Sequence, residues 1–158
     1  MDNKTLIALM TKETKAKCIK STKESLQEGF LNATTNLNYF RNKEIVKNHP
    51  SLRDLFLLDV ELLQGFYYNL YNLKFDQSLS TLNQMKENRV NILNYYSENH
   101  NVIINCTEIL HFELEKFPEH HSKYKNDNGY LQLSDKYKYQ FQELEKLFES
   151  MSLLCQTY

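Results

Sequence analysis

The sequence predicts an all-α protein, a helical bundle of about five or six helices around a central buried helix at residues 51–75. Apolar residues recur at helical spacing through most of the 158-residue chain. Only three Gly and two Pro are present, which leaves little of the turn chemistry that a sheet protein needs. The stretch at 51–75 carries two adjacent apolar stripes, and two stripes indicate burial on more than one side of a helix.

The central helix has a clear predicted start. Pro50 disfavours helical backbone at the residue before it, and Ser51 is a good N-cap. Gly65 in mid-helix costs about 1 kcal/mol relative to Ala, so it predicts the close approach of another helix. The two stripes are Leu55, Leu62, Phe66 and Leu73, and Phe56, Leu63, Tyr67 and Leu70.

Residues 3–40 are predicted to be helical, as either one helix or two. A core stripe starts at Leu26 and repeats at helical spacing through Phe40. Gly29 lies inside this stripe and is the expected position of a break or bend. Residues 1–24 carry many lysines and weak periodicity, so a loosely packed basic arm is the alternative for that part.

The second half of the chain is expected to add three helices, at 76–98, at about 102–117 and at 135–154. Each has an apolar face in helical register. Residues 118–134 form the predicted long loop, with a turn signal at 126–129. At this length the whole chain, 1–158, is expected to be a single domain.

The net charge of −1 conceals two unlike halves. Residues 1–50 carry nine Lys/Arg and five Asp/Glu, whereas residues 51–158 carry ten and fifteen. Such halves suit two partners of opposite charge, or attract one another. Cys18, Cys106 and Cys155 are odd in number and far apart, which favours reduced thiols. Without a signal-like or membrane-spanning apolar run, the expectation is a cytoplasmic protein with no membrane association.

The sequence favours a protein without catalytic activity, cofactor or metal. It contains no Gly-rich phosphate loop and no familiar catalytic motif. Glu108, His111 and Glu115 resemble part of a carboxylate–histidine metal site of helical bundles, but they lie on the polar side of their helix and have no second Glu-x-x-His pair. The other candidate ligands are Glu119, His120 and His121. A metal-dependent enzyme of a helical bundle is therefore the third hypothesis.

Nucleic-acid binding is the second hypothesis, and it depends on five lysines near the N-terminus. They are Lys12, Lys15, Lys17, Lys20 and Lys23. Lysines at this density can contact phosphates. Aromatic residues are not interleaved with them, and Arg, the preferred reader of bases, is scarce along the chain.

The first hypothesis is a non-catalytic protein that binds another protein. Tyrosine is enriched at interfaces, and tyrosines, acids and histidines gather around the predicted loop. The expected partner-binding residues are Glu108, His111, Glu115, Glu119, His120, His121, Tyr124, Asp127 and Tyr130. Their acidity suits a basic partner, such as a nuclease-like toxin. An immunity protein, an antitoxin or a small regulatory adaptor fits this description, while the partner and the oligomeric state stay open.

Overall fold

The computed structural model describes residues 2–42, 50–98 and 129–156. These residues form five helices and no strand, which confirms the predicted all-α class and the helical bundle. The helices are α1 (Asn3–Leu9), α2 (Lys12–Asn42), α4 (Pro50–Tyr71), α5 (Phe75–Glu98) and α8 (Gly129–Leu154).

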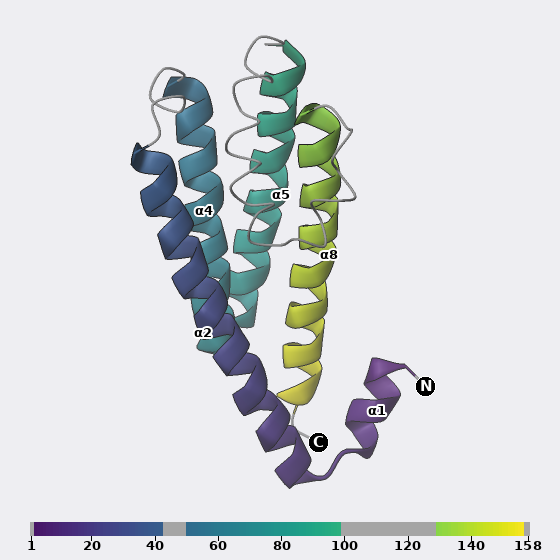
Figure 1. Cartoon of the computed structure of the whole chain (residues 1–158). Coiled ribbons are helices and arrows are strands. Elements are labelled where there is room, and N and C mark those ends of the chain that lie inside the picture. The colour runs from purple at the N-terminus through teal and green to yellow at the C-terminus, as the bar shows by residue number, and fades with distance from the viewer. Residues whose placement is uncertain (1, 43–49, 99–128, 157–158) are drawn as a thin grey trace.

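The four long helices run alternately up and down as an antiparallel bundle (Figure 1). Helix α4 packs against α2 and α5, and α8 packs against α5 and α2. The short α1 contacts α8. The first turns of α2 extend past the connection between α4 and α5 (Figure 1). The lysine-rich part of α2 therefore projects from one end of the bundle.

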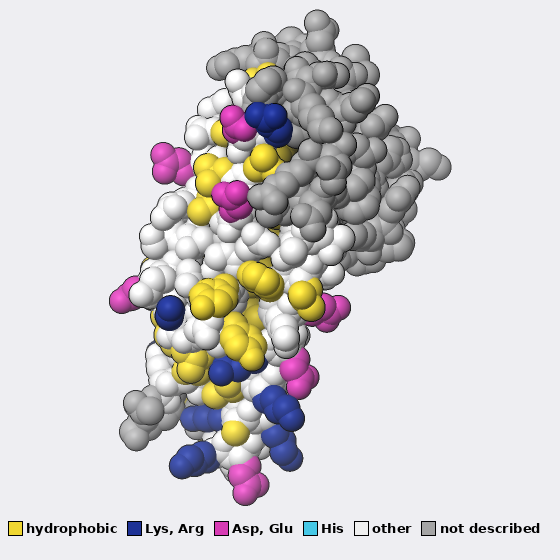
Figure 2. All heavy atoms as spheres, turned by 90° about the vertical axis from the view of Figure 1, so that its left-hand side faces the viewer, with side chains coloured by type: hydrophobic (Ala, Val, Ile, Leu, Met, Phe, Trp, Pro, Cys, Tyr) yellow, Lys and Arg dark blue, Asp and Glu magenta, His cyan; other side chains and the backbone are white. Residues whose placement is uncertain are grey.

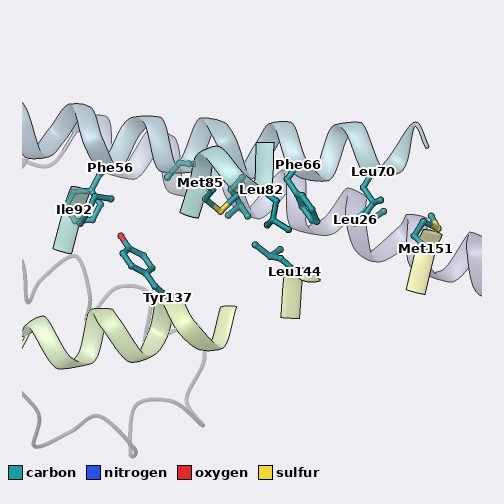
Figure 3. Packing of buried hydrophobic residues seen from close by; sticks show 13 residues of the cluster. Leu26, Phe56, Phe66, Leu70, Leu82, Met85, Ile92, Tyr137, Leu144 and Met151 are labelled. Carbon is teal, nitrogen blue, oxygen red and sulfur yellow. The ribbon is translucent and has the colours of Figure 1, made fainter. Parts of the chain in front are cut away.

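The core contains side chains from all four long helices. Figure 3 shows three groups along the bundle: Phe56, Ile92 and Tyr137 at one end, Phe66, Leu82, Met85 and Leu144 in the middle, and Leu26, Leu70 and Met151 at the other end. Of the thirteen residues in this buried cluster, α4 contributes five, more than any other described helix. The central buried helix that the sequence predicts is therefore α4.

The predicted end of the central helix is wrong by four residues. Helix α4 ends at Tyr71, and Leu73 follows it with a left-handed φ of 60°. The Leu73 amide donates to the carbonyl of Leu70 (3.1 Å), and the Lys74 amide donates to that of Asn69 (2.8 Å). This pattern is a Schellman cap, in which Gly usually occupies the left-handed position. Because a leucine stands there, apolar periodicity continues through the turn and hides it.

The N-terminal segment is two helices, but the predicted break at Gly29 is wrong. The break lies at residues 10–11, where the side-chain hydroxyl of Thr11 accepts a hydrogen bond from the Thr14 amide (3.1 Å) and caps α2. Gly29 lies within the continuous helix α2. Residues 12–24 belong to the same helix that buries Leu26 in the core.

Helix α8 begins at Gly129, six residues before its predicted start at Asp135. The final part of the predicted loop 118–134 is therefore helical. Leu and Gln, which favour helices, recur directly after the turn signal and account for this earlier start. The predicted helix at 102–117 and residues 118–128 lie outside the described residues.

The two helical glycines differ in how closely a neighbour approaches them. A Cβ built on Gly29 would lie 2.7 Å from Cζ of Tyr67, closer than real Cβ atoms come to a neighbour. A Cβ on Gly65 would lie 3.5 Å from Cγ2 of Thr81, an ordinary contact. The close approach between helices that was predicted at Gly65 thus occurs at Gly29 on α2, where the ring of Tyr67 from α4 packs against the glycine.

Candidate binding surface between α2 and α4

The surface expected from the sequence lies almost entirely outside the described residues. This holds for Glu108, His111, Glu115, Glu119, His120, His121, Tyr124 and Asp127. For Tyr130 only the backbone is described, in the first turn of α8. Within the described ranges, no three His, Cys, Asp or Glu side chains are grouped as metal ligands would be. The partner surface and the metal alternative at these positions stay predictions.

A groove of about 240 Å³ lies between α2 and the C-terminal part of α4. Its lining residues are Leu26, Gln27, Phe30, Tyr67, Tyr68, Tyr71 and Asn72. Figure 2 shows hydrophobic side chains gathered midway along this face of the molecule, with Lys and Arg side chains on the lower part of the face. Aromatic and basic side chains therefore meet on one surface.

The three tyrosines of the groove have different roles. Tyr67 packs against Gly29, and burial raises the pKa of its phenol, an effect that the charge of Arg89 opposes. Tyr68 and Tyr71 keep 55% and 38% of their surface exposed. Tyr67 thus forms a partly buried, neutral wall of the groove, whereas Tyr68 and Tyr71 offer ring surface to a partner.

Two lysines lie against the exposed rings. The Nζ atom of Lys23 lies 5.3 Å from the ring centroid of Tyr71, and Nζ of Lys74 lies 5.9 Å from that of Tyr68. Both distances allow a cation–π interaction. The ion pairs of the described residues involve Arg53, Arg89 and Lys146, so neither rim lysine has a carboxylate partner there.

The five lysines of the nucleic-acid hypothesis point in different directions around α2. At about 100° per residue, Lys20 and Lys23 lie within about 40° of Gln27, which lines the groove, and Lys12 lies about 60° away. Lys15 and Lys17 lie farther round the helix. The aromatic residues missing from this part of α2 are supplied by α4. Sequence reasoning missed this pairing because lysines and tyrosines that meet in space are far apart in the chain.

Backbone strain occurs next to the groove. A leucine in the left-handed region is costly, and such residues concentrate at functional sites. Leu73 has this conformation and directly follows Asn72, whose side-chain amide donates to the Tyr68 carbonyl (2.8 Å). The cap of α4 therefore fixes the end of the groove with a conformation that leucine rarely adopts.

A buried charge cluster links α4, α5 and α8. Nε of Arg89, a residue only 4% exposed, donates to a carboxylate oxygen of Asp59 (2.8 Å), and its Nη2 donates to the side-chain carbonyl of Gln140 (2.7 Å). The guanidinium carbon lies 4.5 Å from the ring centroid of Tyr137. Nη1 is buried and has no hydrogen-bond partner among the described residues. The cluster joins three helices, and none of its residues lines the groove.

Lys136 on α8 is an ionisable group whose pKa responds to both its burial and the charges of this cluster. Burial and, to a smaller extent, the charge of Arg89 lower the pKa of its ammonium to about 7, and the charge of Asp59 opposes the shift. In the unfolded chain the pKa of a lysine is near its ordinary value of about 10.4. Between these two values the unfolded state binds more protons than the folded state, so stability rises with pH.

We therefore expect the free energy of unfolding to increase from pH 7 to pH 9 in the native protein, and to increase less in Lys136→Met. Urea denaturation of both proteins across this range measures the difference. Equal pH dependence in the two proteins would show that Lys136 keeps an ordinary pKa.

The two described cysteines, Cys18 and Cys155, are free thiols. Cys155 packs against the core cluster. Burial raises the pKa of its thiol, and the charge of Lys23 opposes this shift. A raised pKa keeps the thiol protonated, which is the unreactive form of cysteine.

Comparison of the chain with protein-family models, with curated proteins and with solved structures gives no match. Among the described helices, none combines the length and the apolar character that crossing a membrane requires. The function is therefore inferred from the chemistry of the described surface.

Proposed function

We propose that this chain is a non-catalytic binding protein that holds a segment of another protein in the groove between α2 and α4. The observation that supports the proposal is the pair of half-exposed tyrosines, Tyr68 and Tyr71, beside a recess with an apolar wall. Tyrosine gives a large contact area at low entropic cost and is enriched at interfaces. Contiguous exposed apolar surface of this kind is typical of interaction sites.

Immunity protein, antitoxin and regulatory adaptor remain the classes that the sequence favours within this proposal. The acidic residues that would attract a basic partner lie outside the described residues. The described groove instead has lysines on its rim. A partner seated there would carry the opposite charge from the one that the acidic residues suggest.

Nucleic-acid binding gains one supporting observation, the position of lysines beside exposed tyrosines. Single strands bind to surfaces that combine cations with aromatic rings on which bases stack. In this groove, however, the ammonium groups of Lys23 and Lys74 lie over the rings of Tyr71 and Tyr68. A base would have to displace a lysine to stack on the same ring face, so a protein segment is the better fit.

The test is capture of the partner from the native host by the tagged chain, with identification by mass spectrometry. We expect the native protein to retain a stoichiometric protein partner, and Tyr68→Ala/Tyr71→Ala to retain it at least about tenfold less, since interface tyrosines often contribute 2 kcal/mol or more. Tyr139→Ala is the matched control, because Tyr139 is 44% exposed on a different helix, α8.

The control also separates the two candidate surfaces. Loss of the partner in Tyr139→Ala, but not in the double variant, would move the interface to α8 and the region predicted from the sequence. Recovery of nucleic acid alone, or of the chain alone, would contradict the proposal. Circular dichroism of each variant verifies that the helical fold is retained.

A further inference from the structure

We infer that the groove takes an acidic segment, with one large apolar side chain in the recess and carboxylates against Lys20, Lys23 and Lys74. The inference rests on the proposed function and specifies the chemistry of the partner. It follows from three properties of the surface: the lining of the recess, the positive charge on its rim, which no carboxylate of the described residues pairs, and the direction in which that charge extends.

The lining residues of the groove favour a partner that inserts an apolar side chain and places its own backbone beside Gln27. Leucine and aromatic side chains supply most of the wall, and Gln27 adds an amide that can both donate and accept hydrogen bonds. The side-chain amide of Asn72 already donates to the backbone at Tyr68. A peptide that buries an apolar side chain here can therefore pair its own backbone with Gln27.

The rim selects acidic residues. Lys20 lies one turn before Lys23 on α2, and Lys74 lies beyond the end of α4, with its Nζ atom over the ring of Tyr68. None of the three forms an ion pair with a described carboxylate. The neighbouring acids of α2, Glu24 and Glu28, lie about 60° and 100° from Gln27 around the helix. Complementary charge at such a rim speeds association and selects the partner.

The basic side chains continue from the groove in one direction. In Figure 2 most Lys and Arg side chains of this face lie below the hydrophobic patch, on the side toward the N-terminal end of α2, which Figure 1 shows projecting from the bundle. The carboxylates of the bound segment should therefore lie on one side of its apolar anchor. We therefore expect the bound segment of the partner to carry an apolar residue with a run of acidic residues on one side of it only.

The test uses fluorescence anisotropy of the full chain with three labelled probes. They are a peptide with one phenylalanine beside a run of glutamates, the same peptide with lysines in place of the glutamates, and oligothymidylate. We expect the acidic peptide to bind at least about tenfold more tightly than the lysine peptide. Affinity for the acidic peptide should fall with rising salt, because exposed charges are screened.

Two charge-reversal variants locate the effect. Lys20→Glu/Lys74→Glu should weaken binding of the acidic peptide about tenfold, since both side chains are exposed at the rim. Lys17→Glu/Lys138→Glu changes the net charge equally at exposed positions away from the groove and should leave the affinity within about twofold. An equal loss in both variants would show a general charge effect and overturn the inference.

The remaining outcomes separate the inference from the proposed function. If neither peptide binds, or both bind equally, the inference fails, while the proposed function stands as long as Tyr68→Ala/Tyr71→Ala loses the captured partner. If oligothymidylate binds more tightly than the acidic peptide and Lys20→Glu/Lys74→Glu abolishes its binding, the groove serves nucleic acid and both fail.

Discussion

Asp59→Leu is expected to lower the free energy of unfolding by about 3–5 kcal/mol, the usual cost of removing one member of a buried ion pair. The substitution leaves the guanidinium of Arg89 buried with no carboxylate among the described residues. Gln140 and the ring of Tyr137 do not neutralise that charge. Urea or guanidinium denaturation, followed by circular dichroism, measures the loss.

The double variant Asp59→Leu/Arg89→Met is the informative control. It removes both charges and replaces them by apolar side chains, so it avoids the cost of an unpaired buried cation. We expect it to be more stable than Asp59→Leu alone, although it carries one more substitution. If Arg89→Met lowers the stability of the Asp59→Leu protein as much as the loss of a well-packed buried side chain ordinarily does, this account of the cluster is contradicted.

The second large effect is expected at Gly29, with Gly65 as its matched control. Replacing a helical glycine by alanine ordinarily stabilises a helix by about 1 kcal/mol. Gly65→Ala should gain about this amount, because its new methyl group meets Thr81 at an ordinary distance. Gly29→Ala should instead destabilise the protein, since its methyl group overlaps three atoms of the Tyr67 ring. Overpacking of this kind costs about 1–3 kcal/mol.

The melting temperatures of the two variants show whether tight packing or helix propensity dominates the effect of alanine at Gly29. Opposite signs support a tight contact between α2 and α4 at Gly29. If Gly29→Ala also stabilises the protein, the Tyr67 ring moves aside without cost, and the wall of the groove is less rigid than its packing indicates. In the expected case, Gly29→Ala also weakens partner binding, because Tyr67 lines the groove.

The fold was largely predictable from the sequence because helix periodicity is a local signal. The stripe through Phe56, Leu63 and Leu70 correctly identified α4 as the most buried helix. The turn around Leu73 was missed, because a leucine occupies the left-handed position where glycine is the usual signal. Boundaries of this kind depend on backbone conformation, which hydrophobic patterning does not encode.

The candidate site was less predictable, because it depends on which helices are neighbours. The lysines of α2 stand out in the sequence, but their position beside the tyrosines of α4 depends on how the two helices pack. The pair of Asp59 and Arg89 gave no signal either, since each looks like an ordinary surface charge until α4 and α5 are placed in register. The sequence therefore predicts the helices but not the contacts between them.

The three-residue connection between α4 and α5 has a consequence for the entropy of the folding chain. A loop that short lets the two helices meet at little entropic cost, since this cost grows with the length of the loop closed. Arg89 accordingly contacts Asp59 across 30 positions, whereas its contact with Gln140 spans 51. The attachment of α8 must therefore overcome the larger loss of chain freedom. The Arg89 cluster and the core residues of α8 provide the favourable contacts that offset it.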